Sequence, residues 1–203
     1  MVSSADDNII KLWSLANNQL LGEIHIDGPV LFLAMSPDEN ELAVGYAQGF
    51  IEFYSLPDLS LYRTLDPDSP SSYAAYSPDG KLLAVGRGTN IDLYALPDLE
   101  ITITLSGHTL PVIEFAFTPD GSMLISGSHD QNLGIWSVND GQLIRMVEGA
   151  DNSINTVTVS PNGTRVASHI LGEMIYIWSL PEGKLLTTFR GNSGMAFTPD
   201  SSI

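Results

Sequence analysis

The sequence predicts an all-β protein made of repeated units, each of them a small antiparallel sheet of four strands. Two sequence markers with one shared period lead to this prediction. The first is a short alternating strand that ends in an aromatic residue, and it occurs five times, at Trp13, Tyr54, Tyr94, Trp136 and Trp178. The steps between these aromatic residues are 41, 40, 42 and 42 residues. Periods of about 20–50 residues are typical of proteins that stack one supersecondary unit.

The second marker is a proline turn with the pattern Ser/Thr-Pro-Asp/Asn. Its five copies begin at Ser36, Ser77, Thr118, Ser160 and Thr198. The proline presets the backbone φ angle, and the glycine that follows in three copies can take a positive φ, so we expect a tight turn between two strands. Because two independent markers share one period, the pattern is a true internal repeat.

Within each repeat the apolar residues alternate as they do in β-strands, and Gly, Asp, Asn and Pro separate the short runs. In residues 109–148 the four runs contain Val112, Phe115 and Phe117; Leu124 and Ile125; Leu133 and Ile135; and Leu143, Ile144 and Met146. Four strands in about 41 residues match one blade of a β-propeller, in which four-stranded sheets surround a central axis. We therefore predict an all-β propeller with no helical domain.

The predicted propeller is one region that covers residues 1–203. Complete blades are expected at residues 28–65, 70–106, 109–148 and 152–190, and partial blades at 1–27 and 191–203. The leading part holds the last three strands of a blade and the trailing part holds one first strand, so the two ends are consecutive in the repeat. Two architectures fit this pattern. One is a fragment of a larger propeller, whose open blade ends could self-associate, and the other is a closed five-blade ring in which the trailing strand completes the first blade.

The repeat that ends at Trp136 carries the most specific motifs, namely Gly107-His108, then TPDG, LISGSHD and IWSV. In these motifs, and in its period along essentially the whole chain, the sequence resembles the WD40-repeat family of β-propellers. The resemblance implies a hydrogen-bonded tetrad inside this blade, formed by His108, Ser126, Asp130 and Trp136. An indole, a hydroxyl, a neutral imidazole and a carboxylate can together satisfy every buried polar atom.

The other repeats depart from this pattern. The partial tetrads that the resemblance implies are Ser3, Asp7 and Trp13 in the first repeat, and Ser168 and Trp178 in the last complete one. In the two repeats that end in tyrosine, a fixed offset places Val44 with Tyr54 and Ala84 with Tyr94, and an apolar side chain cannot join a polar network. Apolar packing is therefore expected to hold these two blades.

Charge and composition exclude several classes of function. The chain has 24 acidic and 8 basic residues and a net charge of −16, which would repel nucleic acid and anionic lipid but allows a basic partner. It has no cysteine, which excludes disulfides and thiol catalysis. The N-terminus lacks a secretory signal, and no apolar run approaches the roughly 20 residues of a membrane span. We expect a cytoplasmic protein if the chain is complete, whereas a fragment would leave the location unknown.

No motif predicts catalysis, a metal site or a cofactor. Ser128-His129-Asp130 contains the residue types of a hydrolase triad, but such triads are assembled in space and not from chain neighbours. The four histidines, His25, His108, His129 and His169, lack the spacing of metal ligands. No glycine-rich loop precedes a helix that could bind phosphate.

The leading functional prediction is a non-enzymatic scaffold for protein–protein interaction. It rests partly on the missing catalytic motifs and partly on the resemblance, because WD40 propellers typically assemble other proteins on their top face. The top-face positions that the resemblance implies are Leu31, Ser72, Arg87, Ile113, His129, Asn155 and Leu171. This composition suits a protein or peptide partner. The alternative is an accessory propeller of a larger peptidase, kinase or redox enzyme that gates or positions the substrate.

Overall fold

The protein consists of β-strands joined by turns and loops. The computed structural model describes residues 1–5, 8–66, 71–148, 150–170, 174–191 and 194–201, with only the backbone described for Ser72. These residues form nineteen strands and no helix, so the described part of the chain contains no helix that could cross a membrane. The predicted all-β class is confirmed.

The strands form five antiparallel sheets, called blades 1 to 5 in chain order, and the strands of each sheet neighbour one another in chain order. Blade 1 contains β1 (Val2–Ser4), β2 (Ile9–Trp13) and β3 (Leu20–His25). Blade 2 contains β4 (Val30–Met35), β5 (Glu41–Tyr46), β6 (Ile51–Ser55) and β7 (Ser60–Leu65). Blade 3 contains β8 (Ser71–Tyr76), β9 (Leu82–Arg87), β10 (Asn90–Ala95) and β11 (Glu100–Ser106).

Blade 4 contains β12 (Val112–Phe117), β13 (Met123–Ser128), β14 (Leu133–Ser137) and β15 (Leu143–Val147). Blade 5 contains β16 (Ile154–Val159), β17 (Arg165–Ile170), β18 (Met174–Ser179) and β19 (Leu185–Arg190). The four strands of a complete blade are called a to d in chain order. Because the aromatic marker ends strand c in blades 2 to 5, and Trp13 ends β2, blade 1 contains strands b, c and d.

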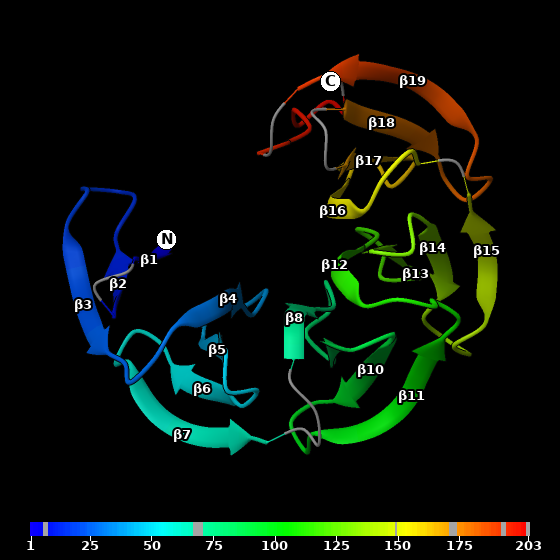
Figure 1. Cartoon of the computed structure of the whole chain (residues 1–203). Helices are drawn as coiled ribbons and strands as arrows, with labels where there is room; N and C mark the ends of the chain where they lie inside the picture. Colours follow the sequence, from blue (N-terminus) through cyan, green and yellow to red (C-terminus); the bar gives the residue numbers. More distant parts are fainter. Residues whose placement is uncertain (6–7, 67–70, 149, 171–173, 192–193, 202–203) are drawn as a thin grey trace.

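The blades stand side by side around a common axis (Figure 1), with strand a innermost and strand d on the rim. Consecutive inner strands pack together: β4 against β8, β8 against β12, and β12 against β16. The ring is open, and the two ends of the chain lie on either side of the opening (Figure 1). The structure is therefore an arc of propeller blades.

The closed five-blade ring is wrong. Residues 194–201 form no strand, and β1 pairs with β2 alone in its sheet. Met195 and Phe197 instead pack against Ala167, Ile175 and Ile177 of blade 5, the place that strand a of the next blade occupies on the earlier blades. The physical reason is the angle between neighbouring blades, which is set by interblade packing and does not turn five blades through a full circle.

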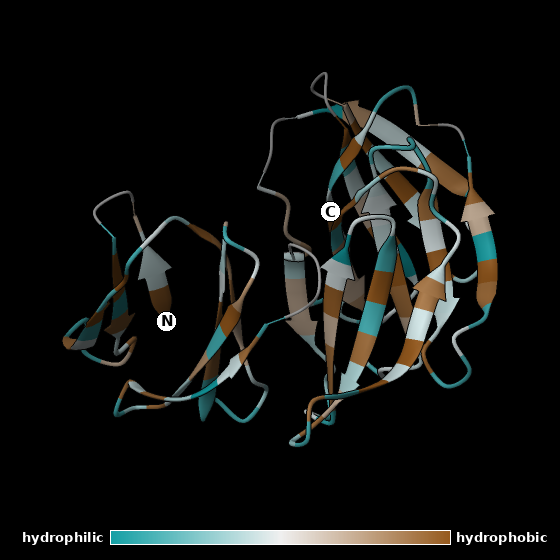
Figure 2. Ribbon diagram, turned by 60° about the horizontal axis from the view of Figure 1, so that its bottom comes forward, coloured by the Kyte–Doolittle hydropathy of each residue, from teal (hydrophilic) through white to brown (hydrophobic). Residues whose placement is uncertain are grey.

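Strands b and c are apolar on both faces because each lies between two neighbouring sheets. In blade 4, β13 is buried from Leu124 to Ser128, whereas β15 on the rim is mostly exposed. Apolar and polar bands alternate along the strands in Figure 2. The cores lie between blades: Ile125 and Ile135 of blade 4 belong to the same cluster as Val157 of blade 5. Each blade is therefore stabilised by its immediate neighbours, as in other repeat proteins.

One hydrogen-bond pattern recurs in all five proline turns. In blade 2, Ser36 Oγ donates to Asp38 Oδ1 over 2.6 Å and accepts the backbone N–H of Glu41 over 2.9 Å. The same hydroxyl-to-side-chain bond recurs at Ser77–Asp79, Thr118–Asp120, Ser160–Asn162 and Thr198–Asp200. These a–b turns and the c–d turns lie at one end of the blades, called the bottom face. The b–c turns and the d–a connections lie at the other end, called the top face.

Candidate functional site

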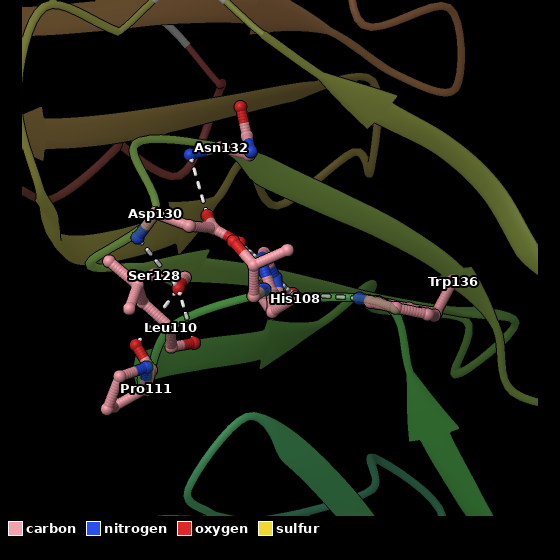
Figure 3. Close-up of polar contacts among 9 residues, drawn as sticks. His108, Leu110, Pro111, Ser128, Asp130, Asn132 and Trp136 are labelled. Atoms are coloured by element: carbon pink, nitrogen blue, oxygen red, sulfur yellow. Dashed lines mark hydrogen bonds and ion pairs between the residues drawn. The ribbon is translucent and has the colours of Figure 1, made fainter.

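The tetrad residues of blade 4 lie together as one hydrogen-bonded chain (Figure 3). Trp136 Nε1 donates to Ser126 Oγ over 2.8 Å, Ser126 Oγ lies 2.8 Å from His108 Nε2, and His108 Nδ1 lies 2.9 Å from Asp130 Oδ2. A neutral imidazole with its proton on Nδ1 donates to the carboxylate and accepts from the serine hydroxyl. Each buried polar group therefore has its partner.

Local geometry in strands b and c makes room for this chain. Ser126 on β13 pairs directly with Gly134 on β14. A Cβ atom at Gly134 would lie 2.5 Å from Trp136 Nε1 and 2.7 Å from Ser126 Oγ. In blade 4, glycine at this position keeps the space beside the indole-to-hydroxyl bond free.

Asp130 connects the tetrad to the top face. Its carboxylate also accepts the backbone N–H groups of Thr109 over 2.9 Å and Asn132 over 3.0 Å. Burial by itself would raise the pKa of Asp130, but the Thr109 amide and the hydrogen bond from His108 outweigh burial and lower this pKa below its usual value. The carboxylate therefore stays ionised and fixes the d–a connection against the b–c turn.

Ser128 adds a second link on the top face. Its Oγ lies 2.9 Å from the carbonyl oxygen of Leu110 and 3.0 Å from that of Pro111, and it accepts the backbone N–H of Asp130 (Figure 3). The neighbouring His129 lies with Nδ1 3.0 Å from Ser153 Oγ of blade 5. Ser128-His129-Asp130 thus contacts three different sets of groups and forms no serine–histidine–aspartate relay.

Blades 2 and 3 contain other buried polar clusters that sequence reasoning missed. In blade 2, Glu52 accepts hydrogen bonds from the hydroxyls of Tyr46 and Tyr54, both over 2.6 Å. In blade 3, Asp92 accepts from Arg87 over 2.7 Å and from Thr104 over 2.6 Å. Both acids stand two places before the aromatic, where blade 4 has glycine. The acidic residue at this position of FIEFY and NIDLY was the sequence signal that could have predicted these two polar clusters.

The strand register also corrects one predicted position. Val85, and not Ala84, lies opposite Asp92 and so occupies in blade 3 the place of Ser126 in blade 4. The step from Val85 to its partner Asp92 is seven positions, whereas the equivalent steps in blades 2 and 4, from Val44 to Glu52 and from Ser126 to Gly134, are eight. A fixed offset from the aromatic residue therefore points to the wrong neighbour in blade 3.

The partial tetrads are bonded in the first and fifth blades. Trp13 Nε1 donates to Ser3 Oγ over 2.9 Å, while Asp7 lies outside the described residues. Trp178 Nε1 donates to Ser168 Oγ over 3.0 Å. In the same blade, Tyr176 donates to Asp151 over 2.8 Å as a separate pair.

The predicted top-face positions differ in what they can offer a partner. Leu31 is 51% exposed, His129 is exposed, and Ile113 and Asn155 are half-buried. Arg87 is committed to Asp92, with its side chain 17% exposed. Leu171 and the side chain of Ser72 lie outside the described part of the chain. Leu110, which sequence reasoning missed, is 49% exposed in the same d–a connection that Ser128 fixes.

A buried carboxyl group joins the inner strands of three blades. Glu114 on β12 accepts hydrogen bonds from Tyr73 of blade 3 and from the Thr156 side chain and Val157 backbone of blade 5. Burial, only partly offset by these bonds, raises the pKa of Glu114 to about 7. Sequence reasoning missed this residue because it reads as one polar position in an alternating strand. No group of three or more potential metal ligands is gathered among the described residues.

Comparisons with known proteins match this architecture. The profile of the "WD domain, G-beta repeat" family matches residues 99–137, which run from the end of blade 3 to strand c of blade 4. WD repeat-containing protein SL1-17 of Schistosoma mansoni is 29% identical over 70% of this chain. B-type cell cycle switch protein ccs52B of Medicago truncatula is 27% identical over 65% of it. WD repeat, SAM and U-box domain-containing protein 1 of Gallus gallus is 45% identical over 23% of it. The chain spans 48%, 19% and 10% of these three relatives.

The tetrad makes a first testable prediction. Replacing Asp130 with alanine leaves His108 and two backbone N–H groups without their acceptor, so we expect Asp130→Ala to lower the free energy of unfolding by about 1–3 kcal/mol. Gln48→Ala, at the corresponding exposed turn position of blade 2, should change it by less than about 0.5 kcal/mol. Denaturant unfolding measures both values, and equal effects would contradict a stabilising role for the tetrad.

Glu114 makes a second prediction, on pH. Its pKa is higher in the folded protein than in the unfolded chain, so its contribution to stability is complete below the unfolded value and is lost as the pH rises through about 7. We expect the melting temperature of Glu114→Gln to rise relative to that of the wild type between pH 5.5 and pH 8.5 (about 1.5 pH units on either side of this pKa). Glu148→Gln, at an exposed position, should follow the wild type. Parallel melting profiles for all three proteins would refute the assignment.

Proposed function

We propose that this chain, which is similar to WD-repeat proteins along part of its length, is a non-catalytic scaffold that binds a protein or peptide partner through its top face. The relationship to WD-repeat proteins supports an interaction scaffold in general. A fold alone does not identify a partner, so the proposal depends on what the top face offers.

The observation that carries the proposal is the fixed top face of blade 4. Ser128 and Asp130 together bind four backbone groups of the d–a connection and the b–c turn. These bonds hold exposed Leu110 and His129 in place, and the bond between His129 and Ser153 continues the surface onto blade 5. A surface that is already ordered loses little conformational entropy when a partner binds, which favours affinity.

The charge of the chain favours a basic partner. A net charge of −16 attracts positively charged proteins over long distances and raises their association rate. Arg87, a predicted contact, is less suited to be an anchor because its guanidinium already pairs with Asp92.

The second candidate function is an accessory propeller within a larger enzyme. The name of the Gallus gallus relative places WD repeats beside SAM and U-box domains in one protein, and this chain spans only 10% of that relative. In such a protein the blades would position or gate a substrate for a catalytic domain outside these residues. A full-length reading frame with a catalytic domain next to these blades would favour this candidate.

The top-face proposal predicts the outcome of an affinity capture. Leu110→Asp combined with His129→Glu places two charges on the proposed surface without altering the tetrad. We expect partners recovered with the wild type from the source cell to fall at least tenfold (about 1.4 kcal/mol) with this variant. The control pair Leu186→Asp and His25→Glu makes the same changes at exposed sites elsewhere and should retain them. Equal recovery with both variants at unchanged melting temperature would contradict the proposal.

We also propose that the open blade ends self-associate. In blade 1, β1 pairs with β2 alone, and the apolar face of blade 5 is covered by Met195 and Phe197 without a complete next blade. Unpaired strand edges and apolar faces promote association. We expect dimers or larger species at micromolar concentration in sedimentation experiments, and fewer with Met195→Asp and Phe197→Asp combined. A wild type that stays monomeric would contradict this proposal.

A further inference from the structure

A cavity of about 480 Å³ opens on the bottom face between blades 2 and 3. The proline turns of both blades, the rim strand β7 and the c–d turn of blade 3 line it. It lies at the opposite end of the blades from the proposed partner surface, so it is a separate site.

A polar cluster forms the inner wall of this cavity. The carboxylate of Glu41 accepts hydrogen bonds from the hydroxyls of Tyr62 and Tyr76 and from Arg63 Nη2, the last over 3.3 Å. The Arg63 guanidinium lies over the ring of Phe53 at 4.6 Å and beside that of Tyr62 at 5.5 Å. Glu41 and Arg63 are 17% and 21% exposed, so their charges largely cancel inside the wall.

The positions of Glu41 and Tyr76 are apolar between the next blades. Between blades 3 and 4 the positions of Glu41 and Tyr76 are taken by Leu82 and Phe117, which pack on the interblade core. Between blades 4 and 5 they are taken by Met123 and Val159. Because apolar pairs join those blades, the polar set is not needed for joining blades 2 and 3. Burying charged groups carries a desolvation cost, so a binding role accounts for the set better than packing does.

The mouth of the cavity is acidic. Asp38 and Asp79 of the two proline turns are exposed there, and hydrogen bonds from Ser36 and Ser77 are the main cause that lowers the pKa of each carboxyl group. Both are therefore ionised at neutral pH. Lys81 lies 3.5 Å from Asp79, but it is 80% exposed and free to move toward solvent. After Glu41 and Arg63 cancel, the lining keeps two negative charges at its mouth.

The remaining surface suits the rest of a long basic side chain. Tyr62 is 53% exposed, and Pro37 and Pro78 line the cavity beside the two aspartates. Aromatic faces attract cations, and apolar walls contact the methylene stem of lysine or arginine.

We propose that this cavity binds the lysine or arginine side chain of a basic peptide segment. The two aspartates at the mouth provide the charge, Tyr62 provides an aromatic face, and the prolines enclose the stem. The site is independent of the top face, so a scaffold that binds one partner there could hold a basic segment of the same or another protein on its bottom face.

The test uses the whole chain and the capped peptide Gly-Arg-Gly-Arg-Gly, titrated by calorimetry and by NMR of the Gly80 amide. The variant is Asp38→Asn combined with Asp79→Asn. Asparagine keeps the oxygen that the turn hydroxyl needs, as Ser160 and Asn162 show over 2.9 Å in blade 5. Asp120→Asn combined with Asp200→Asn is the matched control, because it makes the same charge change in the corresponding turns away from the cavity.

We expect the Asp38/Asp79 variant to bind the arginine peptide at least tenfold more weakly than the wild type, and the control variant to bind it as the wild type does. The same peptide with citrulline in place of arginine should not shift the Gly80 amide. If both variants lose the same affinity for the arginine peptide, the overall charge of the chain and not the cavity would explain the binding. That result would overturn the proposal. Equal binding of the citrulline peptide, or no binding by the wild type at millimolar peptide, would overturn it as well.

Discussion

The structure depends on one constraint, which is that the middle strands of each blade are apolar on both faces. A sheet with two apolar faces cannot be stable in water unless a neighbouring sheet covers each face. In blade 4, Ile125, Leu133 and Ile135 are fully buried, and their cluster extends into blade 5. The repeat period and the radial arrangement of the blades both follow from this requirement.

Burial between neighbouring sheets also explains why the polar networks differ from blade to blade. A polar side chain between two sheets must find a partner, since an unpaired one costs about 1–3 kcal/mol. Gly134 leaves space for the indole and serine of the tetrad, whereas Glu52 and Asp92 at the same position bind tyrosine, arginine and threonine groups. The departures from the WD40 pattern in blades 2 and 3 are therefore substitutions of one satisfied network by another, and the family profile matches around blade 4, where the tetrad is complete.

Much of the fold could be predicted from the sequence because it depends on local patterns. The period located the blades, and the hydroxyl-to-aspartate bonds of the proline turns explain why Ser36 and its equivalents recur in phase. Ring closure could not be predicted, since the angle between blades depends on interblade packing and not on the period. Ala84 was misplaced because the step between the paired positions of strands b and c is one residue shorter in blade 3. Arg87 looked like a surface contact because the sequence does not reveal that Asp92 pairs with it across a hairpin.

The functional features divide in the same way, into those that local sequence patterns predict and those that depend on contacts between distant segments. The tetrad could be expected from the resemblance to the WD40 family, whereas the fixed position of Leu110, the acid at Glu114 and the cavity beside Glu41 each depend on contacts between segments far apart in the chain. These contacts hold Leu110 and His129 in place at the top of blade 4, and they bring Asp38 and Asp79 to one cavity at the bottom between blades 2 and 3.

The most direct test of this account is native-state hydrogen exchange of the strand b and c amides. If interblade packing is the main source of stability, β9 and β10 of blade 3, which has no tetrad but two neighbours, should be protected as strongly as β13 and β14 of blade 4. The amides of β2 in blade 1, which has one neighbouring blade, should exchange faster than either. Strong protection confined to blade 4, with blade 3 exchanging as fast as blade 1, would show that the tetrad stabilises the fold and would contradict the account.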